Sequence, residues 1–437
     1  MSTVRRPDHH RSAPQGGHRA ASAGRPATQT AGLRHVLAHL VTPLLMCLGM
    51  GLAYLGAFAH PAPHHLPVAV VGSSRSAQLL AQSINDRSGG DLEARTVPRR
   101  ATAVEQLKHQ DIFGAYVMNA AAQGQSEERS QGQARGQVQG QTQGQTQGQA
   151  RGAGAPELLV ATAGSDTSAS VVQKIFTPLA ARQGAPLKVT DVAPPAEDDP
   201  TGQGIFFLLV AISIGSYASV AVIGGAGAVL PLRLRAALAI GTSVVVSLIG
   251  TALAGPVFHL VDHGLGGLWG MAWLYSAGVL LIGTGLHTFL KRWTTLGVMA
   301  LFVMLNFTSS GGIFRPEMQN GFFAALHSFW NGAGFVEGLR SHVYFDGYGL
   351  SGHVWTLVGW LLVGVLMVGL AGLAERRRRA AEEEAAANAA AVAAAAVAAT
   401  VPEPRPQRSV GAATSGTGSA YTATDEEEEE MEEAVGV

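Results

Sequence analysis

Long runs of apolar residues divide the chain into segments that can cross a lipid bilayer and segments that cannot. Hydrocarbon offers no water to backbone N–H and C=O groups, so a spanning helix needs about 20 mostly apolar residues. The runs of this length are Leu40–Ala59, Gly204–Gly225, Ala236–Phe258, Gly267–Leu290 and Val354–Ala374. A further run, from about Thr294 to Asn306, is shorter. The pattern predicts an α-helical polytopic membrane protein with six transmembrane helices, one near the N-terminus (35–60) and five in a domain over 201–375.

The first apolar run has two interpretations, a permanent anchor or a cleaved signal peptide. Ala57-Phe58-Ala59 has the small-x-small form of a cleavage site. The run is, however, longer than the 7–15 apolar residues that are usual in a signal peptide. We expect an anchor, and in either case the residues that follow lie outside the cytoplasm.

Positive charges in the short connections predict the orientation in the membrane. Lysine and arginine accumulate on the cytoplasmic side of membrane proteins. They stand at Arg233 and Arg235, at Lys291 and Arg292, and at Arg376–Arg379 after the last run, whereas the longer loop before the last run has only Arg315 and Arg340. The connection from Phe258 to Gly267 has none. We therefore expect a multi-pass protein of the cell membrane with both termini cytoplasmic.

The region between the first and second runs alternates between two kinds of apolar pattern. Short apolar runs bounded by turn residues predict strands at Leu66–Gly72, Leu92–Val97, Ile112–Met118, Leu158–Thr162 and Leu187–Val192. Apolar residues at helical spacing predict helices over Ala77–Ile84, Ala101–His109 and Val171–Leu179. Alternating strands and helices favour a small extracellular α/β domain over 61–200 with a largely parallel sheet.

Three segments have no apolar pattern that could form a core. The N-terminal 1–34 are basic and predicted to be disordered and cytoplasmic. Within the α/β domain, 123–154 are dominated by glutamine and glycine and predict a flexible insertion. The cytoplasmic tail 376–437 begins with an Ala/Glu-rich stretch that can stay helical to about Ala399, and ends in an acidic, disordered part.

Composition excludes several classes of protein. Of the 437 residues, 47% are hydrophobic and only 14% charged, against roughly 25% charged in soluble domains. The net charge of −1 gives no basic field for nucleic acid. The single Cys47 allows no intrachain disulfide. No phosphate-binding P-loop and no Gly-x-Ser-x-Gly elbow is present, so we expect no enzyme activity and no cofactor.

A histidine pair after the third apolar run is a weak candidate for a metal site. His259 and His263 are four residues apart, with Asp262 beside the second. On a helix this spacing would put both imidazoles on one face, as a metal site requires. A solvated membrane interface explains the same residues, and we prefer that interpretation.

The most informative segment is the loop 307–352 before the last apolar run. Its polar and glycine residues follow a short span directly, which predicts a re-entrant, non-helical backbone at membrane depth. Its aromatic residues, such as Phe322, Phe323 and Trp330, predict a helix pair lying in the outer interface. A structural lid is one interpretation, and a substrate path or gate is the other. The residues assigned to the gate are Asn306, Ser309, Ser310, Gly311, Gly312, Phe314, Pro316, Glu317 and Arg340.

The same segment carries a family resemblance. Ser310-Gly311-Gly312-x-Phe314-x-Pro316-Glu317 is followed by Gly321-Phe322-Phe323, Leu326-His327, Arg340 and Tyr344-Phe345. In this order, and with one span before and five after an external domain, the chain resembles the phage-infection-protein-like membrane proteins and related ABC-type exporter permeases. The resemblance implies a permease that works with a separate ATPase subunit, as a homo- or heterodimer. Thr308-Ser309 and Asn331-Gly332 depart from that pattern, because the family often has proline there.

Two functions follow from these patterns. The first is a permease-like subunit of an ABC-type exporter, moving a hydrophobic or amphipathic compound with ATP hydrolysis supplied by a separate subunit. The second is a non-transporting membrane scaffold or surface receptor that displays the extracellular domain. The predicted cytoplasmic connections around Arg233–Arg235 and Lys291–Arg292 are very short and leave little surface for an ATPase, which favours the second function.

The predicted orientation can be tested by labelling single cysteines in a chain whose Cys47 is replaced. We expect Ser74→Cys to react with a membrane-impermeant maleimide added to intact cells, because it lies in the predicted external domain. Ser409→Cys, in the predicted cytoplasmic tail, is expected to react only after the cells are opened. The reverse result would refute the orientation.

Overall fold

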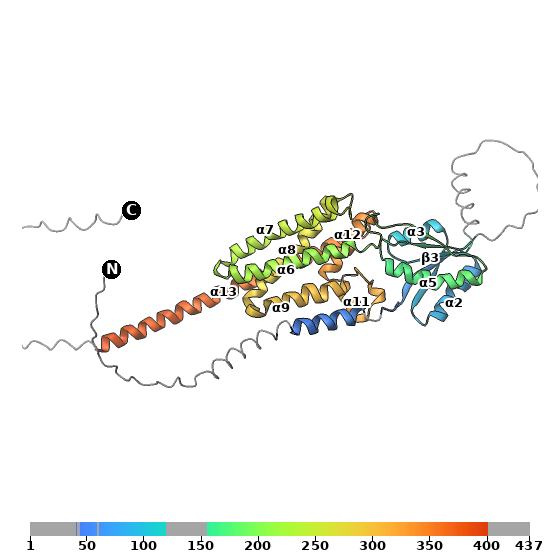
Figure 1. Cartoon of the computed structure of the whole chain (residues 1–437). Coiled ribbons are helices and arrows are strands. Elements are labelled where there is room, and N and C mark those ends of the chain that lie inside the picture. The colour runs from blue at the N-terminus through green and yellow to red at the C-terminus, as the bar shows by residue number, and fades with distance from the viewer. Residues whose placement is uncertain (1–40, 42–43, 59–60, 119–154, 401–437) are drawn as a thin grey trace, which may run out of the picture. The chain divides into compact units, whose positions relative to one another are not determined.

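The computed structural model describes residues 41, 44–58, 61–118 and 155–400. The described part is mostly helical and includes one small β-sheet (Figure 1). The N-terminal segment 1–34, the Gln/Gly-rich insertion 123–154 and the acidic end of the tail lie outside the described residues. The chain divides into one compact unit up to Arg377 and a second from Arg378 onward.

The sheet forms the centre of the α/β domain. Its described strands have the order β2-β1-β3-β4-β5. β1 is parallel to both β2 and β3, and β4 is parallel to β5, whereas β3 and β4 are antiparallel. The small α/β region expected from the sequence is therefore confirmed. The strands are β1 (Leu66–Val71), β2 (Leu92–Val97), β3 (Ala115–Val117), β4 (Glu157–Val160) and β5 (Lys188–Asp191).

Helices cover both faces of this sheet. α2 (Arg75–Ser88) and α5 (Asp166–Arg182) pack on one face, and α3 (Arg100–Lys108) packs on the other. β1 is buried on both sides, which explains why it is a continuous apolar run rather than an alternating one. The hydroxyls of Ser74 and Ser165 accept backbone N–H bonds at the starts of α2 and α5 (3.3 and 3.2 Å).

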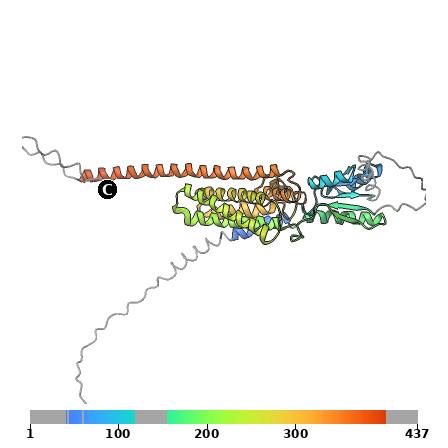
Figure 2. The same ribbon diagram turned by 90° about the horizontal axis from the view of Figure 1, so that it is seen from above.

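Apolar helices make up most of the remaining structure. Among the described residues, four helical stretches are long and apolar enough to cross a membrane, namely Gly204–Val229, Leu232–Val257, Leu265–Ser309 and Leu350–Val397. They contain α6 (Gly204–Gly225), α7 (Leu232–Ala252), α8 (Leu265–Leu290) and α13 (Leu350–Thr400). The first apolar run contributes a shorter helix, Leu44–Phe58. Membrane-compatible helices are thus confirmed, while the count of six spans stays a prediction. α13 is continuous over its whole length (Figure 2).

The third of these stretches reverses direction at Lys291, whose φ is 49°. Beyond it lie α9 (Thr294–Met299), a π-helical turn (Ala300–Leu305) and α10 (Asn306–Ser309). Asn306 Nδ2 donates to Tyr275 Oη (2.8 Å), although the two residues are 31 positions apart in the sequence. Because both are about equally distant from Lys291, the segment 294–309 runs back along α8 as a separate part of the bundle.

The predicted interfacial helix pair differs from what the structure shows. α11 (Gly321–His327) is partly exposed, but α12 (Asn331–Tyr344) is buried at every residue from Asn331 to Ser341. The predicted non-helical backbone is also shorter than expected, because Asn306–Ser309 are helical and the irregular turn begins only at Ser310. The aromatic residues of this loop predicted helices at the membrane interface. In the structure, the glycines of α12 allow close packing and its charged side chains form ion pairs, and α12 lies inside the bundle.

Candidate functional site

A cluster of buried ions joins α12 to the irregular segment between α10 and α11. Glu337 Oε2 lies 2.6 Å from Arg315 Nη1, and Glu337 Oε1 lies 3.0 Å from Arg340 Nη1. The three side chains are between 2% and 9% exposed. We call Arg315, Glu337 and Arg340 the ion cluster.

Arg340 also holds the backbone of the predicted gate. Its Nη1 donates to the carbonyl of Gly311 (2.8 Å) and its Nη2 donates to that of Gly312 (3.1 Å). Gly311 has φ +74°, and a Cβ there would lie 2.6 Å from His327 Cε1. A Cβ on Gly312 would collide with the ring of Phe206 on α6. The Gly-Gly pair is therefore required by one left-handed turn and one close helix approach.

Charge balance within the ion cluster fixes the protonation of Glu337. Burial by itself would raise the pKa of this carboxyl, but the guanidinium groups of Arg315 and Arg340 outweigh it and lower the pKa to about 2. Burial lowers the pKa of the nearby His327. His327 Nδ1 donates to the Ser309 carbonyl (2.9 Å), so the ring helps to hold the same turn. Glu337 is thus a carboxylate at neutral pH.

Arg315 extends the cluster into the α/β domain. Its Nη1 donates to Gln110 Oε1 (2.8 Å), and its guanidinium lies 5.1 Å from the centre of the Phe113 ring. Thr167 Oγ1 of α5 donates to the carbonyl of Ile313 in the same segment (3.0 Å). The segment that Arg340 holds from the bundle side is therefore also held from the sheet side.

A second set of contacts connects the same two regions. Lys108 Nζ at the end of α3 pairs with Asp346 Oδ2 (3.3 Å). The next residue, His109, stacks on Tyr348 with ring centres 3.6 Å apart. These contacts lie beyond the C-terminal end of α12, so α12 is linked to the α/β domain through both the ion cluster and the turn before α13.

A directed series of hydrogen bonds runs into the bundle from Asn306. Its Oδ1 accepts from the N–H of Gly332 (2.7 Å) and its Nδ2 donates to Tyr275 Oη (2.8 Å). Tyr275 Oη lies 2.6 Å from Ser213 Oγ. Since Ser213 gives its own hydrogen to the Leu209 carbonyl (2.6 Å), Tyr275 is the donor to Ser213. We call Asn306, Tyr275 and Ser213 the polar chain, and all three are fully buried.

The other predicted gate residues lie around these two features. The backbone carbonyl of Ser309 accepts a hydrogen bond from His327, and Ser310 Oγ donates to the carbonyl of Phe307 (3.0 Å). Phe314 contacts Phe58 of the first helix (ring centres 5.7 Å apart). Pro316 and Glu317 line a cavity of about 410 Å³ together with His64, Gln319, Gly321 and Ala324. The structure thus brings most of the predicted residues to one end of the bundle, whereas the ring of Phe314 packs against the first helix.

Sequence reasoning missed three central residues, Glu337, Tyr275 and Ser213. Glu337 was detectable as an isolated carboxylate in a stretch rich in glycine and apolar residues. Tyr275 and Ser213 had no such signal, because single hydroxyls are common in apolar helices. Their role depends on which helices are neighbours.

The weak metal candidates are not brought together. The helical backbone ends at the π-helical turn Leu253–Val257, so His259 and His263 do not share a helix face as expected. His259 is 61% exposed, and His263 Nε2 donates to the Val343 carbonyl (3.2 Å). Among the described residues, no group of three or more His, Cys, Asp or Glu side chains could hold a metal ion.

Comparison of the chain with protein-family models, curated proteins and solved structures finds no match. The resemblance to exporter permeases therefore stays a prediction, and any functional argument depends on the geometry described above.

The close approach at Gly312 generates a first structural prediction. We expect Gly312→Ala to lower stability by about 1–3 kcal/mol, because the added Cβ overpacks against buried Phe206. Gly321→Ala is the matched control, since a Cβ there meets no atom within 4 Å. Thermal unfolding of the detergent-solubilised protein measures both, and an equal effect at the two positions would contradict the packing described here.

The low pKa of Glu337 generates a second prediction. At pH 7, Glu337→Gln is expected to lower the free energy of unfolding by about 3 kcal/mol. The variant leaves buried Arg340 without its carboxylate and Arg315 with only Glu317, whose Oε2 lies 3.8 Å from Arg315 Nε. A carboxyl whose pKa falls on folding stabilises above its unfolded value of about 4.3 and loses that contribution as pH falls towards 2. The difference in the free energy of unfolding between wild type and variant should therefore become smaller as the pH falls from 5 to 2. The exposed Glu93→Gln serves as control in the same melting series, and a constant difference would refute the assignment.

Proposed function

We propose that the chain is the permease-like subunit of an exporter that moves a hydrophobic or amphipathic compound. The proposal is carried by the polar chain, which places hydrogen-bonding groups inside a bundle whose helices α6 and α8 contain no Asp, Glu, Lys or Arg. Amide and hydroxyl side chains join helices inside membrane bundles, and here they would also offer hydrogen bonds to a compound that passes between these helices. ATP hydrolysis would come from a separate subunit, because the sequence has no P-loop.

The arrangement of the spans belongs to the same proposal. With Leu44–Phe58 as an anchor and 294–309 as a short span beside α8, the chain has one helix before the α/β domain and five after it. Both termini are then cytoplasmic, and the α/β domain is extracellular. The largely buried pair Arg235–Glu375 would lie at the cytoplasmic end of the bundle, where it joins α7 to α13.

The ion cluster supplies a means of control in this proposal. Arg315 contacts the α/β domain, and Arg340 holds the Gly311-Gly312 backbone, with Glu337 between them. A displacement of the α/β domain would therefore act on the Gly311-Gly312 turn, which follows Asn306 of the polar chain in the sequence. Packed interfaces of this kind switch between discrete arrangements rather than deforming continuously.

A scaffold or surface receptor is the second candidate. It is favoured by the number of contacts that fix the α/β domain to the bundle, and by the short connections Ala226–Val229 and Lys291–Trp293. Such connections offer little surface on which an ATPase could dock. In this function, the polar chain would serve only to orient α6, α8 and α10.

Export of a fluorescent amphipathic dye distinguishes the two candidates. Cells that produce the chain should clear preloaded Hoechst 33342 faster than cells that produce Tyr275→Phe, because the variant breaks the polar chain at its central hydroxyl. Tyr217→Phe on α6 is the matched control.

Purification of the chain from its native membranes should also recover a stoichiometric ATPase. Absence of both dye export and a bound ATPase would support the scaffold instead.

A further inference from the structure

A cavity of about 240 Å³ opens between α2 and α5, on the face of the sheet away from α3. Beneath it lies the ring of Phe176, which is fully buried and stacks on Tyr116 with ring centres 5.1 Å apart. Half-buried Ile84, Ile175 and Leu179 form apolar walls. The cavity is part of the α/β domain and has no residue in common with the ion cluster or the polar chain.

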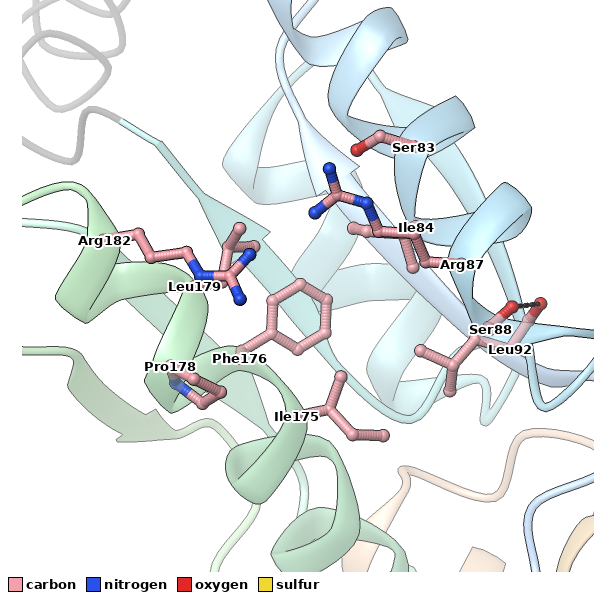
Figure 3. Close-up of a pocket in the computed structure, with 10 residues that line it drawn as sticks. All are labelled: Ser83, Ile84, Arg87, Ser88, Leu92, Ile175, Phe176, Pro178, Leu179 and Arg182. Carbon is pink, nitrogen blue, oxygen red and sulfur yellow. Dashed lines mark hydrogen bonds between the residues drawn. The ribbon is translucent and has the colours of Figure 1, made fainter.

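Two arginines stand at the opening of this apolar cavity. Figure 3 shows Arg87 of α2 and Arg182 of α5 extending towards Phe176 from opposite sides. Within the part of the chain that the structure describes, neither guanidinium has a hydrogen-bond or ion-pair partner. The two positive charges at this opening repel each other, and an anion bound between them would offset the repulsion.

The remaining polar groups of the lining do not supply such an anion. Ser83 Oγ donates to the Leu80 carbonyl (2.9 Å), and Ser88 Oγ donates to the Asn85 carbonyl (3.1 Å). Ser88 Oγ also lies 3.3 Å from the Leu92 carbonyl (Figure 3), so both hydroxyl hydrogens are used within the α/β domain. The free donors of the cavity are the two guanidinium groups, whose planar N–H forks suit a carboxylate or a phosphate.

We infer that this cavity binds a small anionic amphiphile, with its acyl chain against Ile84, Ile175 and Leu179 and its carboxylate or phosphate between Arg87 and Arg182. The apolar walls favour a hydrocarbon chain, and the two arginines favour a negative head group. The cavity is smaller than the roughly 300–1,000 Å³ of drug-sized sites, which favours a short chain. The inference does not depend on transport, because the site lies wholly in the α/β domain.

Isothermal titration calorimetry of the full chain in lipid nanodiscs tests this inference, with empty nanodiscs as the blank. Octanoate is the probe, octanamide is its neutral analogue, and inorganic phosphate is an anion without a chain. We expect saturable binding of octanoate, with octanamide and phosphate at least about tenfold weaker. A parallel titration with octyl phosphate identifies the preferred head group. Equal binding of octanamide or of phosphate, or no heat above the blank, would overturn the inference.

Paired variants locate the binding in this cavity. Arg87→Ala/Arg182→Ala should weaken octanoate binding at least about tenfold, because both charge-assisted contacts are lost. Arg75→Ala/Lys174→Ala is the matched control, since it removes two exposed positive charges from the same two helices outside the cavity. Equal binding by the two double variants would overturn the assignment. The wild-type comparison of octanoate with octanamide stands on its own if a variant fails to fold.

Discussion

The carboxylate of Glu337, held between two guanidinium groups, is the interaction on which the arrangement of the bundle and the α/β domain depends. Removing these charges from water is costly, and the cost is recovered only when every charge has partners. Arg340 finds further acceptors in the carbonyls of Gly311 and Gly312, and Arg315 finds one in Gln110. The cluster therefore has all of these partners only when α12, the irregular turn and the α/β domain are in place.

A charged helix inside the bundle requires room, and glycine provides it. α12 carries Gly334 and Gly338 on faces where neighbouring elements come close. A Cβ on Gly334 would lie 3.1 Å from Thr356 of α13, and one on Gly338 would lie 3.1 Å from Met271 of α8. Small residues allow helices to approach closely in membranes, where packing rather than hydrophobicity drives association. The glycines of α12 thus allow this helix to be buried among its neighbours, with Glu337 and Arg340 facing the turn.

Local patterns were sufficient to predict the α/β domain but not the site. β2 was predicted with its observed bounds, because its apolar run is bounded by turn residues and needs no knowledge of its neighbours. The burial of α12 was not predicted, because Glu337 finds Arg315, 22 residues away in the sequence, only in the folded chain. His259 and His263 were considered on one helix because the apolar run continues to Phe258. Pro256 lies in the π-helical turn that ends the helix first.

The distribution of charge along the bundle bears on what could pass through it. Arg235 and Glu375 pair near one end, and the ion cluster lies near the other. Between them, the polar chain offers only an amide and two hydroxyls, all already hydrogen-bonded to one another. A low-dielectric interior of this kind opposes a bare ion, because no fixed charge offsets its lost hydration. A compound that crosses here would exchange hydrogen bonds with Asn306 or Tyr275 and keep its apolar part against the helices. An uncharged or amphipathic cargo therefore fits the proposed permease better than an inorganic ion.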